Sequence, residues 1–143
     1  MFKHTITYTD YNGQSHTEDF YFNISRAELA SLETSVKGGY TAMLERLIQT
    51  DDTVSIYSQF EDLVKLSYGE KSPDGKRFMK SKELTDAFVQ TEAYSELIMQ
   101  LLQSSEFAST FVNNLVSGVN VDKTQQDKLK QQVAEKLHIL PEA

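Results

Sequence analysis

Residues 68–97 read YGEKSPDGKRFMKSKELTDAFVQTEAYSEL and join a long amphipathic stretch to a helical C-terminal third. At its centre, residues 72–75 (Ser-Pro-Asp-Gly) have the composition of a type I turn, because proline presets φ at the second position and glycine suits the fourth. A basic group follows the turn and flanks Phe78: Lys76, Arg77 and Lys80. Ser81 then marks the start of a helix. We therefore predict a turn that separates two helical parts of the chain.

The stretch before this turn predicts the longest helix, at about residues 52–68, capped by Thr50 or Asp51. Its apolar residues recur at helical spacing: Ile56, Tyr57, Phe60, Leu63, Val64 and Tyr68. Gly69 is the expected helix stop. Two shorter helices precede it. A capping box of Ser25 and Glu28 predicts the first, which runs to about residue 35 and ends at a Gly-Gly pair, and residues 40–49 predict the second.

The N-terminal segment predicts a β-hairpin. Residues 2–9 and 15–22 are rich in strand-forming Thr, Ile, Tyr and Phe, and Asn12-Gly13 lies between them. Phe20 and Phe22 share one face of the second strand, so we expect helices to cover that aromatic end. A lone hairpin is only marginally stable in water and has to pack on other elements.

After the central turn, three short helices are expected. The first begins at Ser81 with Leu84, Ala87 and Phe88 facing inward. The second begins at Thr91 and repeats apolar residues at i, i+3, i+4 and i+7: Tyr94, Leu97, Ile98 and Leu101. The third, capped by Ser105, carries Phe107, Phe111 and Leu115 and ends at Gly118.

Residues 119–143 differ in character, with four Lys and four acidic residues at net zero charge. Asp122 can cap a helix of about residues 123–138, whose narrow apolar stripe of Leu129, Val133 and Leu137 suits one helix–helix contact. We therefore predict a domain of residues 1–118, with a hairpin at 2–22 and helices over 25–118, and a charged helical extension at 119–143. Truncation after Gly118 is expected to leave the domain folded.

These elements predict an α+β, mostly α fold, with the N-terminal hairpin packed on a bundle of about five to seven short helices. The chain of 143 residues is long enough for one domain with its own core. Its net charge of −7 argues against nucleic acid or an anionic membrane as the main partner. The chain has no Cys and no 18-residue apolar run, so we expect a soluble, cytoplasmic protein.

No group of residues predicts catalytic, metal-binding or cofactor-binding chemistry. The three histidines, His4, His16 and His138, lack a carboxylate motif and are expected at the surface or a sheet edge. No phosphate-loop spacing surrounds the Gly-Gly pair at 38–39. The basic segment after residue 72 could bind an anion, but solvated side chains on an exposed turn explain it more simply.

Three parts of the sequence together resemble the tail assembly chaperones of long-tailed, non-contractile bacteriophages of Gram-positive hosts. They are the opening TITYTDYNG…TEDFYFN, the segment LVKLSYGEKSPDGKRFMKSKELTDAFVQTEAYSELIMQLL and the string FASTFVNNLVSG. The resemblance covers about residues 2–118, and we expect family members to end before the charged extension.

The resemblance implies a non-enzymatic helper in the host cytoplasm, absent from the mature virion. It would bind and solubilise the tape measure protein while tail tube subunits assemble around it. The tube protein is a second candidate partner, and self-association would suit a protein that coats a long partner. Partner contacts are expected at Tyr68, Phe78, Tyr94, Leu129, Val133 and Leu137. The alternative is a structural tail or head–tail completion protein that stays in the virion.

Overall fold

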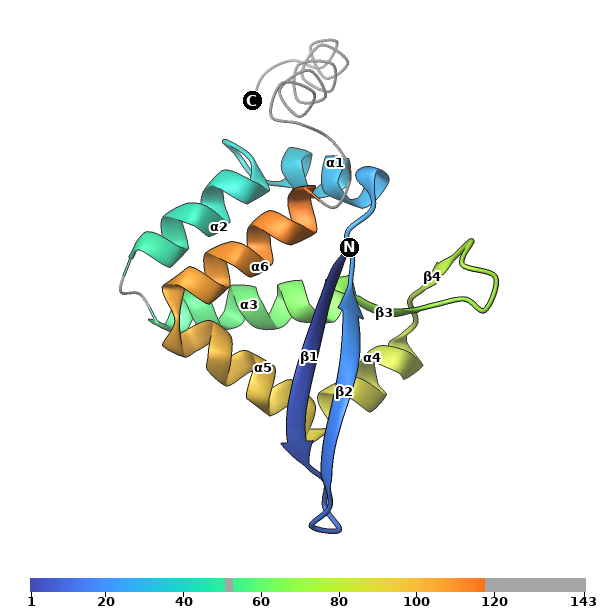
Figure 1. The fold of residues 1–143 in the computed structure, drawn as a ribbon. Coiled ribbons are helices and arrows are strands. Elements are labelled where there is room, and N and C mark those ends of the chain that lie inside the picture. The colour runs from blue at the N-terminus through green and yellow to red at the C-terminus, as the bar shows by residue number, and fades with distance from the viewer. Residues whose placement is uncertain (51–52, 118–143) are drawn as a thin grey trace.

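A computed structural model of the chain describes residues 1–50 and 53–117 (Figure 1). Strands β1 (Phe2–Thr9) and β2 (Ser15–Phe22) form the expected antiparallel hairpin, in a register that pairs Phe2 with Phe22 and Thr9 with Ser15. The loop is closed by the Asp10 N–H, which donates to the Gln14 carbonyl at 2.8 Å, and by the Gly13 N–H, which donates to the Asp10 carbonyl at 3.0 Å.

The two faces of the hairpin differ sharply. The face toward the helices carries Ile6 and Phe22, both buried, and half-buried aromatic residues. The opposite face is exposed except at the half-buried Tyr21, and it is rich in threonine. On this face Thr5 donates to Asp19 at 2.6 Å, and the hydroxyls of Thr7 and Thr17 lie 3.0 Å apart. This alternation is typical of an antiparallel sheet with one solvated face.

Two short strands extend the hairpin, and neither was predicted. Helix α3 (Thr53–Ser67) leads directly into β3 (Tyr68–Lys71), which pairs with β2, and β4 (Phe78–Met79) pairs with β3, in the order β1-β2-β3-β4. The expected helix to residue 68 is therefore one residue too long. The backbone changes there because the Ser67 carbonyl accepts from the Asn23 N–H at 2.8 Å and Tyr68 pairs with Phe22.

Gly69 does not act as the predicted helix stop. It is the second residue of β3 and pairs with Tyr21 of β2. A Cβ atom at this position would lie 2.6 Å from the Met79 carbonyl oxygen and 2.6 Å from the Phe78 ring. Glycine is needed here because the β4 backbone and an aromatic ring approach the chain too closely for any side chain.

Helices α1 (Arg26–Ser35) and α2 (Tyr40–Gln49) form as predicted. The capping box of α1 is complete, since the Ser25 hydroxyl accepts from the Glu28 N–H and the Glu28 carboxylate accepts from the Ser25 N–H. The N-cap residue of α2, Gly39, has no side chain. Glu33 of α1 compensates by accepting from the Thr41 N–H at 2.9 Å and from the Thr41 hydroxyl.

The central turn leads into helices α4 (Lys82–Val89), α5 (Glu92–Gln103) and α6 (Ser105–Ser117). Ser81 caps α4 as expected, but Ser104 rather than Ser105 caps α6, because its hydroxyl accepts from the Phe107 N–H at 3.1 Å. Ala87 was expected to face inward and is exposed, as is Tyr57 of α3. Both residues lie at the border of an apolar stripe, where helical spacing alone does not decide burial.

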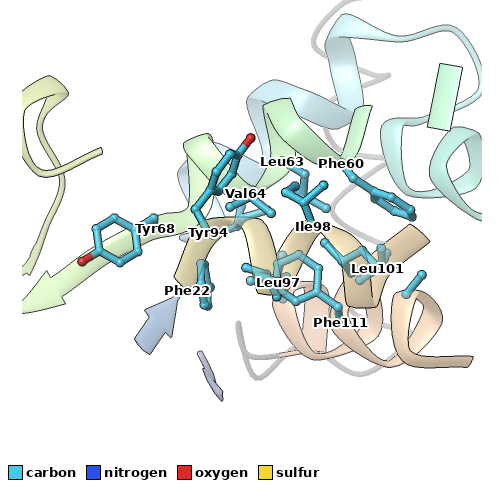
Figure 2. Close-up of a cluster of buried hydrophobic side chains, with 14 of the residues drawn as sticks. Phe22, Phe60, Leu63, Val64, Tyr68, Tyr94, Leu97, Ile98, Leu101 and Phe111 are labelled. Atoms are coloured by element: carbon cyan, nitrogen blue, oxygen red, sulfur yellow. The ribbon is translucent and has the colours of Figure 1, made fainter. Parts of the chain in front are cut away.

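One apolar core joins the sheet to all six helices of the part of the chain that the structure describes. The four strands and six helices confirm the predicted α+β, mostly α class. In Figure 2 the side chains of α3, α5 and α6 meet Phe22 of the hairpin. All four predicted core residues of α5 are buried. The predicted cap at Asp51 and the predicted helix at 123–138 lie outside the described residues.

Candidate partner-binding surface

The described residues hold no group of three or more His, Asp or Glu side chains placed to bind a metal ion. In that same part of the chain, no helix is both long and apolar enough to cross a membrane. Of the six residues predicted to contact a partner, the structure describes three: Tyr68, Phe78 and Tyr94.

Tyr68 lies at the junction of helix and sheet and is largely buried, with 7% of its surface exposed. Its ring stacks on Phe88 of α4 at 4.2 Å between centroids and an angle of 8°, and it meets Phe22 edge-on. Burial raises the pKa of the Tyr68 hydroxyl, with smaller contributions from Glu70 and Glu18. In Figure 2 this hydroxyl points away from the other labelled side chains.

Tyr94 of α5 also contacts Phe88, edge-on, and has 8% of its surface exposed. Its hydroxyl donates to a carboxylate oxygen of Glu61 on α3 at 3.4 Å. Burial raises the pKa of Tyr94, and Glu61 and then Tyr57 raise it further. Tyr94 is therefore a core residue whose hydroxyl reaches the partly exposed Glu61 side chain, where α3 and α5 meet.

Phe78 is half-buried on β4, where its ring covers Gly69. The Nζ atom of Lys80 lies 5.9 Å from the Phe78 ring centroid. The other three residues expected to contact a partner, Leu129, Val133 and Leu137, lie outside the described residues. The structure thus brings Tyr68 and Tyr94 together around Phe88 and places Phe78 apart from them, on the short outer strand.

The basic residues after the central turn have separate roles. Lys76 and Arg77 are exposed, as expected. Lys80 is not a solvated side chain, because its Nζ atom donates to both carboxylate oxygens of Glu28 at 2.8 Å. Joint substitution of all three would therefore also remove the contact that ties this segment to α1.

An exposed apolar face of α3 was not predicted from the sequence. Val54 is 82% exposed and Tyr57, one turn further, is 42% exposed. Glu61 continues the same side of the helix and connects to Tyr94 through the hydrogen bond described above. We call Val54, Tyr57 and Glu61, with the Tyr94 hydroxyl, the α3 face. The sequence indicates this face through the apolar stripe of the helix, which is wider than the side that packs against the core.

The two described histidines do not form a site with each other. His4 pairs across the hairpin with Phe20, and His16 pairs with Tyr8. The His16 Nε2 atom lies 2.6 Å from the Asp10 carboxylate, and this hydrogen bond lowers the pKa of Asp10. The His4 Nε2 atom lies 2.8 Å from the Gln100 side-chain oxygen. The His16–Asp10 contact lies within the hairpin, whereas the His4–Gln100 contact ties the hairpin to α5. His138 lies outside the described residues.

Comparison with known proteins identifies a family for this chain. The family model described as phage tail assembly chaperone matches residues 1–141. No curated protein and no solved structure shows a significant match. The family match includes residues 119–141, so the expectation that family members end before the charged extension is wrong.

Proposed function

Since the chain belongs to the phage tail assembly chaperone family, we propose that it is a non-enzymatic chaperone that binds the tape measure protein and keeps it soluble during tail tube assembly. The observation that carries this proposal is the family match over residues 1–141. The protein would act in the host cytoplasm and be absent from the mature virion. The tail tube protein is a second proposed partner, and copies of the chain would associate along the tape measure.

The α3 face supports the proposal because it offers apolar surface at helical spacing. An amphipathic helix of the tape measure protein could lay its apolar side against Val54 and Tyr57, in the manner of helix-in-groove recognition. Glu61 and the Tyr94 hydroxyl would give this small surface a polar rim. Such a contact is weak on its own, which suits a chaperone that tube subunits later displace.

The buried tyrosines fit this arrangement in a supporting role. Tyr94 joins α3 to α5 beneath the α3 face, while Tyr68 holds the start of β3 against α4. We retain Phe78 and the stripe of Leu129, Val133 and Leu137 as proposed contacts, with the extension docking on a neighbour or partner. Truncation after Gly118 should then weaken partner binding and leave the domain folded.

A pull-down with the tape measure protein tests the α3 face. The double variant Val54→Asp/Tyr57→Asp should bind about tenfold more weakly or worse, because it places two charges in an apolar contact. Tyr11→Asp is the control, since Tyr11 is 77% exposed on the hairpin loop, away from α3. Binding should persist in EDTA and without ATP, because the proposed contact uses neither a metal ion nor a nucleotide. It should also persist in 0.5 M salt, where the Debye length is about 4 Å, because salt screens apolar contacts little.

Equal binding by the double variant and the wild type would exclude the α3 face as the contact. The broader proposal would fail if the wild-type chain did not bind the tape measure protein and was instead recovered from purified virions. That result would favour the structural tail or head–tail completion protein.

A further inference from the structure

Charge is distributed very unevenly along the second half of the described chain. Residues 68–82 carry five basic and two acidic side chains, whereas residues 83–117 carry five acidic side chains and no basic ones. The first group lies on the β3–β4 turn and its flanks, and the second lies on α4, α5 and α6. One acidic molecule therefore presents a local cationic projection and a separate anionic helical surface.

The cationic projection is a well-ordered turn. The Ser72 N–H donates to the Arg77 carbonyl at 2.8 Å, and the Arg77 N–H donates to the Ser72 hydroxyl at 3.0 Å. The Asp74 carboxylate accepts from the Ser72 hydroxyl at 2.6 Å and from the Lys76 N–H at 3.0 Å. The only acid of the turn is thus engaged in holding its shape. A preorganised turn loses little conformational freedom on binding.

Two cations of this turn are left for a partner. Lys71 lies over the Tyr21 ring, Lys80 binds Glu28 and Lys82 binds Asp86. The side chains of Lys76 and Arg77 are exposed, and neither forms an ion pair with any residue that the structure describes. In Figure 1 the turn projects from the right side of the molecule, clear of the helices.

The complementary surface lies on α5. Glu92, Glu96 and Met99 follow one another at i, i+4 and i+7 and therefore share one side of the helix. Glu96 is exposed and Met99 is 49% exposed, while Glu92 accepts from the Tyr11 hydroxyl at 2.8 Å. In Figure 1, α5 and the basic turn lie on opposite sides of the hairpin, so the two surfaces of one molecule do not neutralise each other.

We propose that the basic turn of one copy, through Lys76 and Arg77, docks on the Glu92–Glu96–Met99 side of α5 in a second copy. The two surfaces have opposite charge and belong to different parts of the molecule, so the contact is head-to-tail. Each added copy leaves one free turn and one free α5 surface, which allows an open chain of copies rather than a closed dimer. The proposed contact depends only on charges of this chain, so it should form without a tape measure protein.

The test is sedimentation velocity of the full chain, without any partner, at increasing concentration in about 0.1 M and 0.5 M salt. At the lower salt the Debye length is about 10 Å. Salt then weakens the long-range repulsion between two negatively charged molecules more than it weakens the short-range attraction between charges at the interface. Wild-type protein should form dimers and longer species that dissociate at the higher salt. Lys76→Glu/Arg77→Glu, and separately Glu96→Lys, should weaken association by about tenfold or more.

Matched charge changes elsewhere provide the controls. Lys3→Glu/Lys37→Glu alters net charge as much as the turn variant, and Glu45→Lys as much as Glu96→Lys, all at exposed positions. Each control should associate like the wild type. An equal mixture of the turn variant and Glu96→Lys should form heterodimers, because the reversed charges attract again.

Three results would overturn the proposal: a wild-type chain that stays monomeric in 0.1 M salt, controls that weaken association as much as the test variants, or association that requires bound RNA. None of them depends on whether the chain binds a tape measure protein. Failure of the proposed function would leave the self-association result unchanged, so the two outcomes are distinguishable.

Discussion

Lys80 donates hydrogen bonds of 2.8 Å to both carboxylate oxygens of Glu28, a residue 52 positions earlier in the chain. Glu28 also completes the capping box of α1, so one carboxylate holds a helix start and anchors the segment between β4 and α4. Both side chains are partly buried, with 22% and 33% of their surfaces exposed. Such a contact contributes more than an ion pair in full solvent.

Replacing Lys80 tests this contact. Lys80→Met should lower the free energy of unfolding by about 1–2 kcal/mol in urea titrations, because it leaves a half-buried carboxylate without its charged donor. Lys82→Met is the matched control, since its pair with Asp86 is exposed and should contribute less than about 0.5 kcal/mol. If the two variants lost equal free energy of unfolding, the Lys80–Glu28 contact would contribute no more to stability than the exposed Lys82–Asp86 pair.

The pH dependence of stability should report on Glu28 as well. Burial raises the pKa of this carboxyl, but hydrogen bonds from Lys80 and Ser25 outweigh burial and hold it below its ordinary value of 4.5. A lowered pKa in the folded state stabilises the fold fully above about pH 4.5, and this stabilisation is lost as the pH falls through the lower folded-state pKa.

Glu28→Gln removes that component. The difference in free energy of unfolding between wild type and Glu28→Gln should therefore be largest near pH 6 and shrink toward pH 3. The part of this difference that depends on pH should be at most roughly 1.4 kcal/mol for each unit by which the pKa is lowered. Glu45→Gln, which alters an exposed carboxylate of α2, should follow the wild-type profile. A difference that stayed constant with pH would contradict a lowered pKa at Glu28.

Gly69 should tolerate no side chain. Gly69→Ala places a methyl group 2.6 Å from the Met79 carbonyl oxygen and the Phe78 ring, so β4 must move away, at a cost of about 1–3 kcal/mol. Gly75→Asn is a useful comparison. Gly75 has φ of +73°, a Cβ atom added there would meet no other atom within 4 Å, and Asn adopts this conformation more readily than most residues. Thermal melts that rank Gly75→Asn as the more damaging change would contradict the close approach of β4.

Phe22 should be the energetic centre of the hairpin contact. It is fully buried and meets Tyr68, Phe88 and Phe111, whereas Phe20 is half-buried. Phe22→Ala should lower the free energy of unfolding by about 3–5 kcal/mol, and Phe20→Ala by clearly less. Unchanged thermal stability in Phe22→Ala would mean that the hairpin is an appendage rather than part of the core.

Local signals in the sequence predicted much of this fold correctly. The Ser25–Glu28 capping box, the turn at residues 72–75 and the apolar spacing of α5 each depend on residues close together in the chain. The strands β3 and β4 depend instead on pairing with β2, which is distant in sequence. Helical spacing continues through Tyr68, so only tertiary contacts decide that the helix ends at Ser67.

The candidate site was harder to predict for the same reason. Tyr68 and Tyr94 are predicted partner contacts, but the sequence alone does not separate core aromatic residues from surface ones, and their burial around Phe88 follows from packing. Tyr57 was assigned to the core by helical spacing and lies instead on the exposed α3 face with Val54. The Lys80–Glu28 contact joins segments 52 residues apart, so no local sequence pattern predicts it.

The most direct test of the chaperone account is the soluble yield of the tape measure protein on co-expression. The account predicts that the wild-type chain raises this yield and co-purifies with the tape measure protein, that Val54→Asp/Tyr57→Asp does so poorly, and that Tyr11→Asp behaves like the wild type. A tape measure protein that is equally insoluble with and without the wild-type chain would contradict the account.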